Sequence, residues 1–135
     1  MPLIDIPEGL VELGASLRQF LDREVRPIAH SYRQDILEGR YEWVKEERRK
    51  LRKRSAELGF WTLHMPEEVG GMGLSYVGQV LLFEEGMRRG LLLAHGESIF
   101  PMVTGPTPIY LDCTEAQREK YLAPLMTADK STCFP

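Results

Sequence analysis

The residue groups of this chain that could carry chemistry are scattered, and none completes a catalytic motif. The run Gly70-Gly71-Met72-Gly73 could cradle a phosphate, but it has neither the Lys-Ser/Thr of a P-loop nor GxGxxG spacing. We interpret these glycines as a sharp turn that needs positive φ angles. Adjacent carboxylates can share acid and base roles when buried together. We expect Glu67-Glu68, after a proline, to face water, and Glu84-Glu85 to form helical ion pairs with Arg88-Arg89. We predict no catalytic residue.

Metal ligation and disulfide bonding also lack a motif. None of the three histidines, His30, His64 and His95, has a second His, Cys or carboxylate at zinc-ligand spacing, so we predict no metal site. We expect His64, in an apolar turn, to be a hydrogen-bonded core histidine. The two cysteines, Cys113 and Cys133, form no CxxC pair, which favours a reducing, cytoplasmic setting.

The bulk composition is that of one ordinary globular domain. The 135 residues carry 27% charged and 43% hydrophobic side chains with a net charge of −3, which gives no general attraction to nucleic acid or anionic membrane. No apolar run approaches 18 residues, so we expect no membrane insertion. The N-terminal sequence MPLIDIPEGL lacks the features of a secretory signal or transit peptide.

Helical periodicity dominates the first half of the chain. Apolar residues recur every three or four positions from Leu10 to Ile28, which predicts a helix from Pro7 to about Glu38. Pro27 lies inside this pattern, so we expect a kink there. No segment alternates as a strand does, which predicts an all-α, up-and-down helical bundle.

The second predicted helix covers residues 41–58 and contains the only basic cluster, Arg48–Arg54. Leu51 interrupts the cluster at helical spacing from Val44 and Leu58. With Tyr41 these residues predict a narrow apolar seam beside a solvated face. We therefore expect no nucleic-acid partner.

Ser75 caps a third predicted helix, whose apolar residues lie on more than one side and predict a mostly buried element. Prolines in the segment 98–113 predict short helical pieces. Thr114 begins the last helix with a capping box, and we expect that helix to bury Tyr121 and Leu122.

Two segments together resemble the N-terminal helical domain of acyl-CoA dehydrogenases. Residues 59–90 have the order Gly-aromatic, Pro-Glu-Glu, Gly-Gly-x-Gly-Leu-Ser, apolar helix and Glu-Glu. Residues 114–125, TEAQREKYLAPL, continue the likeness, which runs from about Leu10 to Phe134. The resemblance implies that residues 1–135 form one α-helical domain, with the family's middle β domain and C-terminal helical domain absent from this chain.

The resemblance also implies the activity and the site. Family members are FAD-dependent oxidoreductases that oxidise the Cα–Cβ bond of acyl-CoA thioesters in fatty acid metabolism. Gly96, Glu97, Phe100 and Thr104 fall at substrate-binding positions, and Phe134 falls at a cofactor-binding position. A bulky Phe100 and a charged Glu97 would favour a short, branched or polar acyl group.

Other implied partners are an electron-transfer flavoprotein or similar acceptor and further copies of the full-length chain. We expect this fragment alone to be inactive and not to retain FAD, because the base and nearly all FAD contacts of the family belong to the later domains. The alternative, from a different class, is a stand-alone helical protein-interaction module without catalytic activity.

Overall fold

The computed structural model describes residues 6–89, 99–101 and 104–132, and every regular element within them is helical. The longer helices are α1 (Glu8–Phe20), α2 (Arg26–Leu37), α3 (Tyr41–Glu57) and α4 (Tyr76–Arg88). Short elements follow near the C-terminus, where α6 (Glu115–Gln117), a π-helical turn (Arg118–Leu122) and α7 (Ala123–Met126) form one continuous helical stretch. Three 3-10 turns cover Phe60–Thr62, Glu67–Val69 and Pro108–Asp112. The all-α prediction is confirmed.

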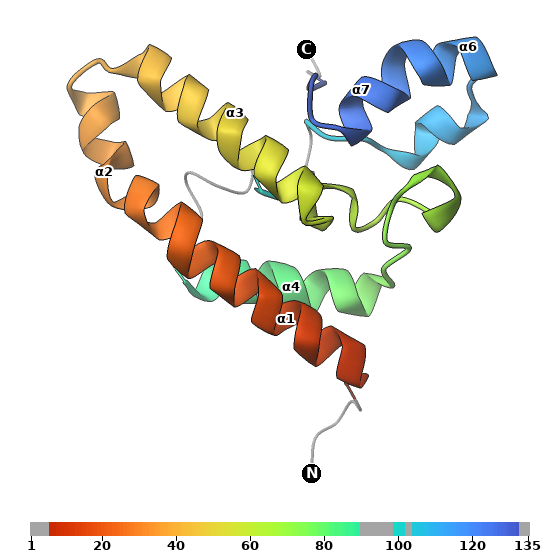
Figure 1. Ribbon diagram of the computed structural model, residues 1–135, viewed down its shortest axis with the longest axis horizontal. Coiled ribbons are helices and arrows are strands. Elements are labelled where there is room, and N and C mark those ends of the chain that lie inside the picture. The colour runs from red at the N-terminus through yellow and green to blue at the C-terminus, as the bar shows by residue number, and fades with distance from the viewer. Residues whose placement is uncertain (1–5, 90–98, 102–103, 133–135) are drawn as a thin grey trace.

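The helices follow an up-and-down path (Figure 1). Helices α1 and α2 form one bent rod, α3 returns beside α2, and α4 lies along α1. Arg18 on α1 pairs with Glu85 on α4, and Asp22, just after α1, pairs with Arg89, just after α4. The contacts follow the same order along the two helices, so α1 and α4 run parallel. Helices α6 and α7 lie on the other side of α3 from α1 (Figure 1).

The predicted kink at Pro27 takes the form of a π-helical segment, Leu21–Val25, between α1 and α2. Pro27 has no N–H to donate to the carbonyl four residues earlier, and its ring would clash with that carbonyl. The preceding turn widens instead, and the Arg26 N–H donates to the Leu21 carbonyl, five residues back.

One apolar core joins these helices. It contains Leu17, Phe20, Leu21 and Val25 from the first rod, Leu51 from α3, Phe60 and Leu63 from the following turn, Leu82 from α4, and Ile99 with Phe100. The predicted seam on α3 is confirmed for Val44 and Leu51, which are buried, and for Leu58, which packs against the core. Tyr41, at the start of the helix, is 58% exposed, so that part of the prediction is wrong.

The connection between α3 and α4 depends on glycine at several positions. Gly59 and Gly70 have φ angles of 85° and 87°, which L side chains rarely adopt. A Cβ at Gly71 would collide with the Met65 carbonyl. Met65 in turn accepts a hydrogen bond from the Gly73 N–H at 2.8 Å. The interpretation of this run as a turn is confirmed.

Two further burial predictions are wrong. Helix α4 is not mostly buried, because Tyr76 and Val80 are 85% and 63% exposed and Val77 and Met87 are also exposed. The apolar residues of α4 do lie on more than one side, but α1 and the core leave the side with Tyr76, Val80 and Met87 exposed. Tyr121 is 47% exposed, whereas its neighbour Leu122 is buried as expected.

Candidate functional site

The predicted site residues fall partly within the described structure. Gly96, Glu97 and Phe134 lie outside the described residues. Phe100 and Thr104 lie within them.

Phe100 packs into the helical core. Its side chain is only 4% exposed, and its ring meets the ring of Phe83 on α4 edge-on, with 4.6 Å between the centroids. The carbonyl of the preceding residue, Ile99, accepts a hydrogen bond from the buried Ser55 hydroxyl on α3. Helices α3 and α4 therefore hold this part of the chain from two sides.

Thr104 lies beside the last described residues of the chain. Its carbonyl accepts a hydrogen bond from the Thr132 N–H at 2.9 Å. Its hydroxyl Oγ1 is buried and has no hydrogen-bond partner among the described residues. Burying a hydroxyl without a hydrogen-bond partner lowers stability. A ligand atom, or a protein group outside the described residues, could therefore bind to this hydroxyl. The structure thus brings a predicted substrate-binding residue next to Thr132, two positions before Phe134.

His64 anchors the same segment from the other side. Its Nε2 lies 2.7 Å from the Pro106 carbonyl, which can only accept, so the proton of the neutral ring is on Nε2. Nδ1 is buried without a partner within the described part of the chain. Burial lowers the pKa of His64, and the bond to the Pro106 carbonyl partly opposes that shift. The expected core histidine is therefore hydrogen-bonded at one ring nitrogen only.

Trp61 ties the C-terminal helices to the core. This fully buried side chain donates its Nε1–H to the Leu125 carbonyl on α7 at 2.8 Å. The guanidinium of Arg52 lies over its ring, 5.4 Å from the centroid. These contacts fix the position of α7 relative to α3. Sequence alone gave no signal for this contact, which spans 64 positions.

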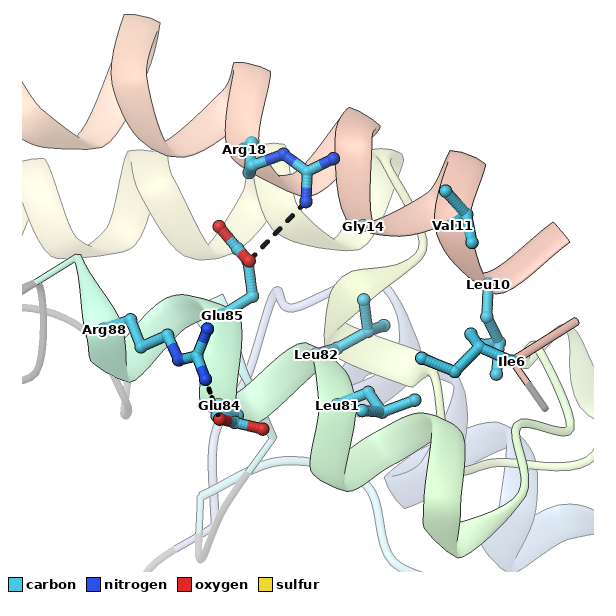
Figure 2. Close-up of a pocket in the computed structure, with 10 residues that line it drawn as sticks. All are labelled: Ile6, Leu10, Val11, Gly14, Arg18, Leu81, Leu82, Glu84, Glu85 and Arg88. Carbon is cyan, nitrogen blue, oxygen red and sulfur yellow. Dashed lines mark ion pairs between the residues drawn. The ribbon is translucent and has the colours of Figure 1, made fainter. Parts of the chain in front are cut away.

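A groove between α1 and α4 is one of the hollows on the described surface (Figure 2). Its volume is about 350 Å³. Two ion pairs lie along it, Arg18–Glu85 at 3.5 Å and Arg88–Glu84 at 2.6 Å, so the charges of the groove balance. The other lining residues are mainly apolar: Ile6, Leu10, Val11, Gly14, Leu81 and Leu82.

This groove is separate from the predicted acyl site. Glu84, Glu85 and Arg88 line it from one flank of α4, whereas Phe83 and Gly86 meet Phe100 on the opposite flank. The pairs Glu84–Arg88 and Glu85–Arg89 confirm the expected structural role of these carboxylates.

Other sequence features form no site among the described residues. The basic cluster on α3 is bound into ion pairs, for example Arg49 with Glu46 and Lys53 with Asp129. No group of three or more His, Cys, Asp or Glu side chains in the described ranges could hold a metal. No helix in those ranges is long and apolar enough to cross a membrane.

Comparison with known proteins gives the family. The family profile described as "Acyl-CoA dehydrogenase, N-terminal domain" matches residues 8–129. The chain is 32% identical, over 87% of its length, to the 3-(aryl)acrylate reductase of Clostridium sporogenes. It is 28% identical over 97% of its length to the mitochondrial short-chain specific acyl-CoA dehydrogenase of Bos taurus, and 28% identical over 98% to the mitochondrial isobutyryl-CoA dehydrogenase of Dictyostelium discoideum.

The chain covers less than a third of these relatives, 28% of the first and 29% of the other two. No solved structure matches it significantly. A match over residues 8–129 nevertheless takes in nearly all of the helical architecture described above. The chain belongs to the acyl-CoA dehydrogenase N-terminal domain family.

Proposed function

We propose that this chain is the N-terminal helical domain of an FAD-dependent acyl-CoA dehydrogenase and forms one wall of the acyl-binding pocket. The observation that carries the proposal is the family match over residues 8–129. The pocket wall would be the segment that contains Phe100 and Thr104, with Gly96 and Glu97 completing it. Residues 1–135 would be a single domain of the longer protein.

The geometry around Thr104 supports this placement. A buried hydroxyl without a partner among the described residues can donate a hydrogen bond to a thioester or flavin oxygen. The Thr132 N–H holds the chain two residues before Phe134 against the Thr104 carbonyl. Because the buried Thr104 hydroxyl lacks a partner among the described residues, they fit a bound ligand that offers an acceptor oxygen there, such as an acyl thioester or a flavin.

FAD, when bound, supplies the acceptor for the hydride that leaves the β carbon. The work of this chain is different. Its helices keep water from the acyl group, and the Thr104 hydroxyl orients a polar atom of the substrate or the cofactor. The base that removes the α proton would lie in a part of the protein beyond this chain.

The names of the relatives support a short, branched or aryl acyl group as the substrate. They name a short-chain specific acyl-CoA, isobutyryl-CoA and a 3-(aryl)acrylate. We further propose a cytoplasmic oxidoreductase of fatty acid metabolism that assembles with copies of itself and passes electrons to an electron-transfer flavoprotein or a similar acceptor.

The test is an activity assay on the protein from the complete reading frame that contains this chain. Purified protein should carry flavin and oxidise acyl-CoA thioesters in the presence of an artificial electron acceptor, with short, branched or aryl acyl groups preferred. The 135-residue chain purified alone should be colourless and inactive. A complete protein with neither flavin nor activity toward any acyl-CoA would contradict the proposal and favour a helical interaction module.

A further inference from the structure

Two glycines of α4, Gly78 and Gly86, are buried where the helix meets other side chains. A Cβ at Gly86 would lie 2.9 Å from Cε2 of Phe100, closer than real Cβ atoms come. A Cβ at Gly78 would lie 2.8 Å from Cγ of Leu74 and 3.0 Å from Cδ2 of Leu10. Each glycine therefore leaves a notch, a gap in the helix surface that a neighbouring side chain fills. Of these two notches, the one at Gly86 is filled by an aromatic ring.

The notch at Gly86 decides where the Phe100 ring can lie. Phe83 precedes Gly86 by one helical turn, so its ring and the notch face the same flank of α4. The edge of one ring against the face of the other is a favourable aromatic geometry, and it seats the Phe100 ring directly against the helix backbone. In this position the ring belongs to the core, because its exposed fraction is 4%.

We propose that Gly86 is a specificity-determining residue. Its notch lets the Phe100 ring pack against α4, and the ring therefore stays out of the acyl pocket. This inference rests on the proposed function, in which the backbone at Phe100 forms part of the pocket wall. Gly86 does not touch the substrate and acts through Phe100, so it is a positioning residue.

A side chain at position 86 would reverse this arrangement. Gly86→Ala places a Cβ 2.9 Å from the Phe100 ring, and Phe83 occupies the neighbouring space on α4, so the ring has to shift away from the helix. A pocket on the side of Phe100 away from α4 would then lose part of its volume to the ring. Acyl groups that need that volume would be excluded, whereas the shortest acyl groups would still fit.

The experiment measures kcat/KM for a short and a medium-chain acyl-CoA with the complete flavin-loaded protein. Gly86→Ala should lower the medium-to-short ratio by about tenfold, the discrimination that one displaced methylene gives in a tight pocket. The double variant Gly86→Ala/Phe100→Leu should restore the ratio, because the smaller side chain no longer blocks the pocket. Gly78→Ala is the matched control, since it creates a similar clash on α4 away from Phe100 and should leave the ratio unchanged.

Phe100→Leu in the otherwise unchanged protein gives a test that does not depend on how well Gly86→Ala folds. A ring held against α4 does not limit the length of the pocket, so this variant should change kcat/KM for the short and the medium-chain substrate by the same factor. A shift of Phe100→Leu toward longer acyl groups would mean that the ring already occupies the pocket and would overturn the inference. So would a Gly86→Ala enzyme with an unchanged ratio, or equal ratio changes in Gly86→Ala and Gly78→Ala. If the wild-type protein oxidises no acyl-CoA, the proposed function itself fails.

Discussion

The Thr104 hydroxyl stands out at the scale of single residues, because it is buried and lacks a partner among the described residues. We expect Thr104→Val to raise the free energy of unfolding of the 135-residue chain by about 1 kcal/mol, since it removes an unsatisfied polar atom. In the complete protein the same substitution should lower kcat/KM by roughly tenfold, because a hydrogen bond to the ligand is lost.

Denaturant titration of the chain and kinetics of the complete protein measure the two effects. Thr107→Val is the control, as Thr107 is similarly half-buried three residues away and its side chain makes no capping bond. A Thr104→Val protein that loses stability and keeps full activity would show that the hydroxyl serves the fold.

His64 gives the second residue-scale prediction, which concerns pH. Burial lowers the pKa of His64 below its ordinary value of 6.5 in the folded protein. The unfolded chain therefore binds the proton more readily, and the free energy of unfolding should fall as the pH drops below about 6.5, until the lowered folded pKa is passed. Above pH 6.5 the residue should have no such effect.

The measurement is a denaturant titration at several pH values across this window. His64→Gln keeps a donor for the Pro106 carbonyl but does not titrate, so its stability should change less between pH 6.5 and pH 5. His30→Gln, at an exposed position on α2, is the matched control. The same pH profile in wild type and His64→Gln would show that His64 does not couple folding to protonation.

At the scale of secondary-structure elements, helix α3 offers a direct test of which face is buried. Leu51 is 4% exposed within the core, so Leu51→Ala should lower the free energy of unfolding by about 2–4 kcal/mol. Arg49 lies on the exposed face and pairs with Glu46 at 2.8 Å, so Arg49→Ala should change it by about 0.5 kcal/mol. Denaturant midpoints measure both effects, and equal losses would mean that the helix face is assigned wrongly.

Helix boundaries were predictable because their signals are local. Ser75 caps α4 by accepting a hydrogen bond from the Gly78 N–H, and Thr114 and Gln117 form the expected capping box. The start and end of α3 also agree with the sequence pattern within one residue. Each of these signals involves residues at most four positions apart, so no knowledge of the tertiary packing was needed.

The packing of α4 and the surroundings of the site were not predictable in this way. Apolar residues on two sides of α4 gave no indication of which side would meet α1, so the expectation of a mostly buried helix was wrong. The position of the Phe100 ring depends on the missing side chain of Gly86. In a sequence pattern, a glycine inside a helix indicates only low helix propensity. The bond from His64 to Pro106 joins residues 42 positions apart, beyond the reach of local patterns.

At the scale of the whole molecule, the question is whether residues 1–135 behave as one domain. The core cluster joins α1, α3, α4 and the segment at Phe100, while Trp61 connects this core to α7 through the Leu125 carbonyl. Contacts that bridge the whole described chain favour a single cooperative transition. The C-terminal helices should then unfold together with the four longer helices.

Trp61 provides the probe for this prediction. In a Trp43→Phe background, which removes the partly exposed second tryptophan, fluorescence reports the environment of Trp61 alone. Far-UV circular dichroism should show a helical spectrum, and its denaturant transition should coincide with the fluorescence transition, because helix content and the contact of Trp61 with α7 are lost together. A fluorescence change at lower denaturant would mean that α6 and α7 detach first, and that the segment holding Thr104 and Thr132 is organised only within the complete protein.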